Sequence, residues 1–259
     1  MRRASDIQHL LRLQRTGNVI FILYLMIKVT NINFSKMKIQ EILSQIVEGN
    51  NQFIKAHHQE YFDSFKSEQR PYITLVTCSD SRVPLNALMK DTSNKVFSIQ
   101  NIGNQILSTE GSVDYGIYHL KTPLLMFMGH SDCGAIKAYL KGFETETYGI
   151  KHELDFLRPT ITEHINNLEF EKLHAHIIEK NLDYQVNIAC KKYKDLIQSG
   201  ELTVIAGFYD FRGEFGKGAG TIIVINVNRH KDIGVMHNMP VFENLTLKQK
   251  ELHIGRLPE

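Results

Sequence analysis

Short apolar segments without charged residues recur along the chain. Four of them are evident from the pattern alone, at residues 72–77, 96–100, 124–128 and 202–207. Segments of this length, rich in valine, isoleucine and leucine, are typical of strands that are buried on both faces of a sheet. The segment at 96–100 contains Ser98 and Gln100 and is the most polar of the four.

Apolar residues at spacings of three and four predict two amphipathic helices. The first follows Met37, and its apolar positions are Ile39, Ile42, Leu43, Ile46 and Val47. The second is predicted over 179–199, with one apolar face made by Leu182, Val186, Ala189, Tyr193 and Leu196. Because strands alternate with helices, we expect an α/β fold with a mostly parallel β-sheet flanked by helices.

The stretch 143–172 is mixed and charged, which predicts short helices and loops. Next to it, His174 and His176 offer two imidazoles. Residues two apart point in different directions on a helix, so we expect both histidines at the surface. Cys190 has apolar neighbours within the second predicted helix and is interpreted as a buried thiol, not as a ligand.

Residues 1–36 form an extension with a character of its own. Four arginines precede an apolar run at 19–27, which has the length of a signal-peptide core but is too short to span a membrane. No small-residue cleavage pattern follows. The extension is therefore either a signal-like segment or a non-native stretch upstream of a start at Met37. We take 37–259 as the functional domain of a cytoplasmic protein without a stable membrane span, or of an exported one if the extension acts as a signal peptide.

The overall composition argues against nucleic acid as a partner and against a disulfide-stabilised fold. The 259 residues are 42% hydrophobic, enough for one sizeable core, and the formal net charge at pH 7 is +2. No basic run with interleaved aromatic residues stands out, so nucleic acid is not an expected partner. Three cysteines, two of which have a better use as metal ligands, leave no disulfide framework.

Reactive side chains gather where two of the predicted strands end. Cys78, Asp80 and Arg82 follow the first strand, and His130 and Cys133 follow the segment at 124–128. Two thiols and one imidazole are typical zinc ligands, and a catalytic zinc with three protein ligands leaves its fourth position to water or substrate. Alternatively, the cysteines are small core residues and the histidine is a hydrogen-bonded turn residue. The pairing of His-x-x-Cys with Cys-x-Asp-x-Arg favours the metal site.

These two motifs, Cys78–Val83 and His130–Gly134, resemble those of the β-class carbonic anhydrase family, and weaker matches extend from Gly49 to Val227. The resemblance implies zinc-dependent, reversible hydration of carbon dioxide to bicarbonate and a proton. It also implies four parallel strands with a fifth at the edge, which 221–227 would form. The family assembles as a homodimer or homotetramer, with the active site between subunits and the amino-terminal helix packed across a neighbour. An ordinary core helix predicts the same apolar pattern after Met37.

Asp80 and Arg82 allow three interpretations. They could form a solvated ion pair of little energetic consequence. Beside a metal, the carboxylate would accept a hydrogen bond from zinc-bound hydroxide, while the guanidinium keeps it ionised and oriented. The resemblance adds a closed state in which Asp80 binds the metal as a fourth ligand. We assign both residues as catalytic.

The resemblance further assigns a substrate pocket of the plant-like subtype to Gln69, Phe97, Ile102, Tyr115 and Gly134. Phe97, Ile102 and Tyr115 would form the wall against which carbon dioxide rests. Gln69 would bond the substrate in the pocket of the adjoining protomer. Gly134 begins a predicted helix whose amides and dipole favour an anion near the metal, and its lack of a side chain leaves room for that anion.

Rival functions stay open, and one residue departs from the family pattern. A close relative on the same scaffold hydrolyses carbonyl sulfide or carbon disulfide. A non-catalytic zinc protein that senses bicarbonate would keep Asp80 permanently on the metal. Gln100 stands where the family usually has arginine, which affects the expected subunit packing more than the zinc site.

Overall fold

The structure is a computed structural model that describes residues 37–161 and 169–258. These residues fall into two compact units, one ending at Lys66 and the other starting at Ser67. The extension 1–36 lies outside the described residues, so both interpretations of it, and the domain boundary at Met37, stay predictions. None of the described helices combines the length and apolar character needed to cross a bilayer.

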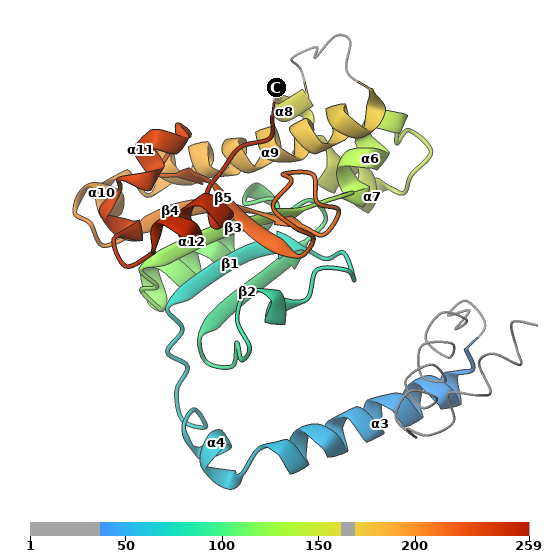
Figure 1. The fold of residues 1–259 in the computed structure, drawn as a ribbon. Coiled ribbons are helices and arrows are strands. Elements are labelled where there is room, and N and C mark those ends of the chain that lie inside the picture. Colours follow the sequence, from blue (N-terminus) through green and yellow to red (C-terminus); the bar gives the residue numbers. More distant parts are fainter. Residues whose placement is uncertain (1–36, 162–168, 259) are drawn as a thin grey trace, which may run out of the picture. The chain divides into compact units, whose positions relative to one another are not determined.

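The first unit contains α3 (Ile39–Ala56) and the short α4 (Gln59–Asp63). The helix predicted after Met37 is confirmed as α3 (Figure 1). Its apolar side chains are exposed, with exposed fractions between 40% and 62% for Ile39, Ile42, Leu43, Ile46 and Val47. The link to α4 is held by aromatic contacts, such as that of Tyr61 with His57 at 4.1 Å between ring centroids.

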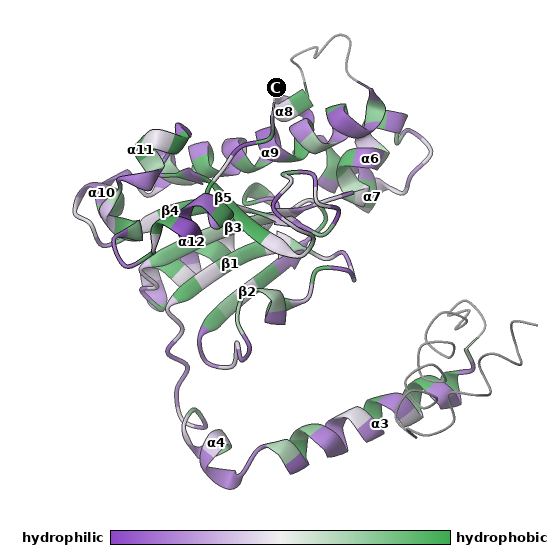
Figure 2. Cartoon of the chain, in the orientation of Figure 1, coloured by the Kyte–Doolittle hydropathy of each residue, from purple (hydrophilic) through white to green (hydrophobic). Residues whose placement is uncertain are grey.

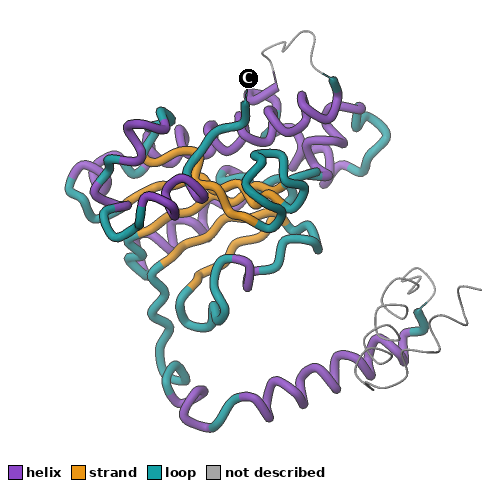
Figure 3. The backbone as a smooth tube through the Cα atoms, in the orientation of Figure 1, coloured by secondary structure: helices purple, strands orange, loops and turns teal. Residues whose placement is uncertain are grey.

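The second unit is built on one sheet of five strands within the described residues. The strands are β1 (Ile73–Cys78), β2 (Val96–Asn101), β3 (Leu124–His130), β4 (Thr203–Asp210) and β5 (Thr221–Val227). Their order is β2-β1-β3-β4-β5; the first four are parallel and β5 runs antiparallel to β4 (Figure 1). Figure 3 shows the strands in orange, lying side by side. The predicted mostly parallel sheet with a fifth edge strand is confirmed.

The long helix α9 (Phe170–Lys192) packs against β3, β4 and β5. In Figure 1 it runs along the sheet, with α6 (Gly134–Lys141), α7 (Tyr148–Asp155) and α8 (Arg158–Ile161) gathered at one of its ends. The remaining short elements are η3 (Leu85–Ala87), η4 (Leu107–Thr109), α5 (Glu110–Asp114), η5 (Tyr115–His119), α10 (Lys194–Gln198), α11 (Ile233–His237), η6 (Pro240–Phe242) and α12 (Leu247–His253).

The predicted helix over 179–199 begins earlier than expected, at Phe170. It is also divided in two, because Tyr193 leaves helical geometry with φ −103° and ψ 29° between the end of α9 at Lys192 and the start of α10 at Lys194. In the part before Glu179 the buried residues are Ala175, Ile177 and Ile178 with the polar His174 among them, which leaves a weak apolar pattern. Figure 2 shows hydrophilic and hydrophobic residues mixed along α9, in contrast to the apolar strands.

Buried side chains lie on both faces of the sheet. Every residue of β1 is buried, as are all residues of β3 after Leu124. This explains why both strands read as uninterrupted apolar runs. Since β1 and β3 are parallel neighbours, with Thr77 opposite Met128, their carboxyl ends lie together at one edge of the sheet. That edge carries the predicted chemistry.

Candidate metal centre

Three donor side chains meet at the carboxyl edge of the sheet. Cys78 is the last residue of β1, His130 is the last of β3, and Cys133 directly precedes α6. Their ligand atoms all lie within 4.8 Å of one another, and all three residues are buried. The predicted set of two thiols and one imidazole is therefore assembled within one chain.

A tight turn brings Cys133 back to His130. Asp132 adopts a left-handed backbone conformation with φ 56°, which reverses the chain between the two donors. The Ser131 N–H donates to the carbonyl of Tyr209 at 3.0 Å and ties this turn to the end of β4. The backbone of Ile136 and Ala135, in the first turn of α6, acts to lower the pKa of Cys133 against the larger effects that raise it.

The His130 ring is prepared to bind a cation. Its Nδ1 lies 2.8 Å from the carbonyl oxygen of Ser131, which can only accept, so Nδ1 carries the proton. Nε2 then has a free lone pair, and this buried atom has no hydrogen-bond partner among the described residues. A buried, unsatisfied nitrogen is costly unless something binds it. The donor set therefore fits a metal ion.

Mutual contact shifts the pKa values of the two thiols in opposite directions. The hydrogen bond from Cys133 lowers the pKa of Cys78, and His130 adds to this effect. The same contact, together with burial, raises the pKa of Cys133. A cation at this position would displace the remaining proton, because the thiolate is the form that binds metals.

Asp80 and Arg82 form a bidentate ion pair beside the donors. The Nε of Arg82 donates to Oδ1 of Asp80 at 2.9 Å, and its Nη2 donates to Oδ2 at 2.7 Å. These hydrogen bonds lower the pKa of Asp80 to about 2. Oδ2 of Asp80 lies 3.9 Å from Nε2 of His130, so the carboxylate borders the centre while it is held by the guanidinium.

Arg82 is itself anchored from two other directions. Its Nη1 donates to Oδ2 of Asp132 at 2.8 Å, and its guanidinium carbon lies 5.0 Å from the ring centroid of Phe211. Asp132 is also paired with Lys137 and, at 2.9 Å, with Arg212. The guanidinium is thereby fixed relative to the turn that carries Cys133.

The five predicted pocket residues divide between the two ends of the sheet. Ile102 follows the carboxyl end of β2, and Gly134 begins α6, so both lie near the donors. Gln69 and Tyr115 line a cavity before the amino end of β1, and Phe97 lies 5.8 Å from Tyr115 between ring centroids. Phe97 pairs with Thr74, four residues before Cys78, which corresponds to about 13 Å along a strand. One chain does not gather the five residues around its own donors.

The prediction that His174 lies at the surface was wrong. His174 is fully buried, and its Nε2 lies 2.9 Å from the carbonyl oxygen of Cys133. His176 points elsewhere and is half-buried, as the spacing of two required. The missed signal was the series His174, Ile178 and Leu182, which places the histidine on the buried face of α9.

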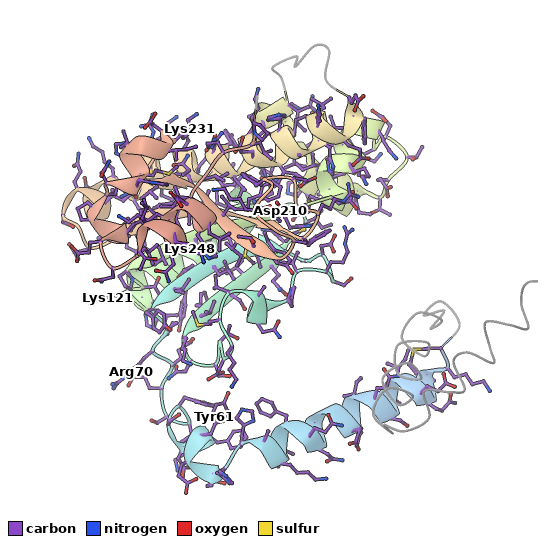
Figure 4. The ribbon with its side chains drawn as sticks, in the orientation of Figure 1. Tyr61, Arg70, Lys121, Asp210, Lys231 and Lys248 are labelled. Atoms are coloured by element: carbon purple, nitrogen blue, oxygen red, sulfur yellow. The ribbon has the colours of Figure 1, made fainter. Side chains whose placement is uncertain are left out.

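Two further features of the site were missed. Asp210, at the end of β4 (Figure 4), accepts a hydrogen bond from the Ser131 hydroxyl at 3.0 Å and from three backbone N–H groups of the following turn. Asp132, Glu171 and His174 also lie close enough together to share a cation. However, Lys137 and Arg212 already neutralise these carboxylates, so this is an ion-pair cluster.

Cys190 is only partly buried, and burial raises its pKa to about 11. The prediction of a buried thiol is thus met only in part. Cys190 belongs to neither group of potential metal ligands among the described residues.

The chain is similar to known proteins over most of the second unit. The family model described as carbonic anhydrase matches residues 73–215. The carbonic anhydrase of Helicobacter pylori (strain J99) is 34% identical over 130 residues, which cover 45% of this chain and 59% of the relative. The carbonic anhydrase of Synechococcus elongatus is 24% identical over 211 residues, which cover 74% of this chain and 75% of the relative. The chain thus spans about three fifths of the Helicobacter protein.

Solved structures share the fold. The β-carbonic anhydrase CcaA superposes with a TM-score of 0.65 at 22% identity, over 76% of this chain and 97% of that chain. The Coccomyxa β-carbonic anhydrase in complex with acetazolamide gives a TM-score of 0.62 at 22% identity, over 75% and 90%. A tetrameric β-carbonic anhydrase from Sordaria macrospora gives 0.62 at 22% identity, over 71% and 97%.

Proposed function

Because the chain belongs to the β-class carbonic anhydrase family, we propose that it catalyses the reversible hydration of carbon dioxide to bicarbonate and a proton with the help of a zinc ion. The observation that carries this proposal is the buried set of Cys78, His130 and Cys133, with the Nε2 of His130 left without a partner. Two thiols and one imidazole are ligands that zinc prefers. Three of them leave one position of a tetrahedral ion open.

Zinc would supply Lewis acidity, which in carbonic anhydrases lowers the pKa of a coordinated water to about 7. Asp80 would orient the attacking water. Its carboxylate is ionised at any physiological pH, since the hydrogen bonds from Arg82 lower its pKa to about 2. An ionised carboxylate can only accept, so it fixes the water by taking a hydrogen bond from it and leaves an oxygen lone pair for carbon dioxide.

Arg82 would keep Asp80 in this orienting role. Both oxygens of Asp80 are held by the guanidinium, which is in turn anchored by Asp132 and Phe211. A closed site, in which Asp80 is a fourth ligand, would have to form in competition with these hydrogen bonds. The arrangement therefore supports the catalytic proposal over a non-catalytic bicarbonate sensor.

We further propose that a second copy of the chain completes the substrate pocket. Ile102 and Gly134 lie near the donors of their own chain, whereas Gln69, Phe97 and Tyr115 lie at the opposite end of the sheet. A homodimer, or a dimer of dimers, would bring the second group to the donors of the neighbour. The exposed apolar side of α3 supports self-association, because a helix with such a stripe is normally covered.

A stopped-flow hydration assay across pH, on protein of measured metal content, tests the proposal. We expect about one zinc per chain and activity that rises toward alkaline pH, because two thiolates donate charge and oppose the acidification of bound water. Protein without stoichiometric metal, or metal-loaded protein without carbon dioxide hydration, would contradict the proposal. Parallel assays with carbonyl sulfide and carbon disulfide decide whether the scaffold serves hydrolysis instead.

A further inference from the structure

The turn after β2 touches both segments that carry sulfur ligands. Asn101, two residues before Gly103, pairs with Cys78 in the sheet, and its carbonyl accepts a hydrogen bond from the N–H of Ser79 at 3.0 Å. A hydrogen bond from the backbone of Gly103 contributes to the lowered pKa of Cys78. Gly103 has φ 82°, and a Cβ built on it would lie only 3.4 Å from the Cβ of Ala135 in the first turn of α6. The Gly103 turn therefore lies against the end of β1, which carries Cys78. It also packs against the first turn of the helix that follows Cys133.

Two side chains of α9 hold this turn from the other side. Asn181 donates from Nδ2 to the carbonyl oxygen of Gly103 at 3.0 Å, and Gln105 donates to the same oxygen at 3.0 Å. Gln185, one helical turn after Asn181, donates to Oε1 of Gln105 at 2.8 Å and to Oδ1 of Asn181 at 2.9 Å. It also accepts from the N–H of Ile106 at 3.0 Å.

The network is closed at the end of β2. Asn101 donates from Nδ2 to the carbonyl of Gln105 at 2.6 Å and accepts from its N–H at 2.7 Å. We call Asn101, Gln105, Asn181 and Gln185 the amide network. Their exposed fractions are 8% or less, and every polar atom of the Gln185 side chain is used.

Burying four amides in this core is not explained by packing. The neighbours of Asn181 and Gln185 on the same side of α9 are fully buried apolar residues, among them Leu182 and Val186. An apolar side chain at either position would pack there without the cost of desolvating an amide. A fully satisfied polar network gives directional restraint instead, which apolar contacts lack. Here the restrained group is the peptide of Gly103.

We propose that Asn181 and Gln185 are positioning residues for the metal centre, which hold Gly103 so that its N–H meets the sulfur of Cys78 and limits the charge that this sulfur donates to the metal. The inference rests on the proposed function, since it requires a metal at Cys78, His130 and Cys133. A hydrogen bond to a ligating sulfur withdraws electron density from it, and partners beyond the ligands tune both affinity and electronic properties.

The test uses the full chain, stripped of metal and reloaded with Zn²⁺ or with Co²⁺ as a spectroscopic probe. Asn181→Leu removes the donor to Gly103, and Gln185→Met removes the support behind it at similar volume. Thr122→Val is the matched control. Thr122 is 2% exposed and shares a hydrogen bond of 2.7 Å with Thr74, at the opposite end of β1 from Cys78.

In both network variants we expect the dissociation constant for Zn²⁺ to rise about tenfold, the scale on which partners of metal ligands act. The sulfur-to-cobalt charge-transfer band should move to lower energy, because a thiolate that loses a hydrogen bond is easier to oxidise. Thr122→Val should change neither quantity, although it also loses a buried hydrogen bond. A purely structural role of the network would lower stability and leave the band in place.

The outcomes distinguish a failure of this inference from a failure of the proposed function. Network variants with the wild-type affinity and the wild-type cobalt band overturn the inference and leave the proposed function intact. A wild-type chain that binds neither ion stoichiometrically overturns the proposed function and the inference with it. If both variants fail to fold, hydrogen exchange in the wild type decides: metal loading should slow exchange of the amides at 103–106, and unchanged exchange overturns the inference.

Discussion

At the scale of the residue, the chemistry of the centre is decided by which atoms are already engaged. His130 commits Nδ1 to a carbonyl, so the other nitrogen is a ready ligand. Asp80 accepts hydrogen bonds from Arg82 at both oxygens, which favours the orienting role proposed for it over that of a ligand. The residue type alone allows either role for the carboxylate.

Removing one sulfur ligand should remove the metal. In Cys133→Ser the hydroxyl does not ionise near neutral pH and is a much poorer zinc ligand than a thiolate. We expect elemental analysis to find less than a tenth of the wild-type zinc content. Cys190→Ser, which changes a thiol outside the donor set, should retain full zinc and thereby control for general damage. Full occupancy in Cys133→Ser would exclude Cys133 as a ligand.

Asp80→Asn should separate metal binding from turnover. The amide is nearly isosteric, so the zinc content should stay at the wild-type level. Hydration should fall by about 100-fold or more, the usual range for a lost proton acceptor, because an amide can also present N–H groups to the water. Stopped-flow rates measured with metal content provide the check. Unchanged turnover would remove Asp80 from the mechanism.

Stability of the metal-free protein should depend on Asp80 at acid pH. Its pKa is about 2 in the folded chain against a usual value of 3.8, so the folded state binds fewer protons between these values. Stability is therefore fully present above about pH 4 and is lost as the pH falls toward 2. Urea unfolding between pH 5 and pH 2.5 should show a steeper loss for wild type than for Asp80→Asn. Equal slopes would mean that the ion pair with Arg82 contributes nothing.

At the scale of the element, the close approach of η5 to β1 depends on a glycine. A Cβ on Gly116 would lie 2.2 Å from the Oγ1 of Thr74, which is fully buried in β1. No side chain fits there without movement of the helical turn or the strand. The same turn carries Tyr115, so this packing also fixes a predicted pocket residue.

Gly116→Ala should therefore destabilise the protein by about 1–3 kcal/mol, the usual cost of overpacking a core. Gly111→Ala is the matched control, because a Cβ there meets nothing within 4 Å. In the helix α5 it should be neutral or stabilising by about 0.5–1 kcal/mol. Urea unfolding of both variants measures the difference, and two equal effects would show that the contact with Thr74 is not restrictive.

At the scale of the whole molecule, the donors and part of the predicted pocket lie about 13 Å apart along β1. This separation makes self-association a functional requirement of the proposed mechanism. In a two-fold dimer, the same pair of surfaces is used twice, so each copy would complete the site of the other.

Complementation between two impaired chains tests this arrangement. Cys133→Ser lacks the metal but keeps Gln69, and Gln69→Ala lacks the amide but keeps the metal. If the two chains are co-expressed in equal amounts and pair at random, half of the dimers are mixed and each mixed dimer has one complete site. Complete sites then make up about a quarter of the wild-type number. We expect hydration activity above that of either chain alone. An activity equal to the average of the two separate variants would place Gln69 outside the neighbour's site.

The sequence was sufficient for the strands and the donors because both leave a local signature. A strand buried on both faces requires an uninterrupted apolar run, and a soft metal site requires thiols and imidazoles at its end. Four of the five strands were predicted from this pattern within a few residues of their actual bounds, and β5 was predicted from the family resemblance. The candidate donors Cys78, His130 and Cys133 were predicted from the same strand ends, and the structure brings them together.

Only the tertiary structure decided how the site is supported. Polar residues of the same types also occur on exposed helix faces, so the sequence does not distinguish His174, Asn181 and Gln185 from surface residues. Their hydrogen-bond partners lie 41 to 80 positions away in the chain. Hydrogen bonds over such separations leave no periodicity, because they depend on how α9 lies across the sheet. The apolar pattern determined which segments are buried; their packing determined which polar groups are buried with them and what those groups hold in place.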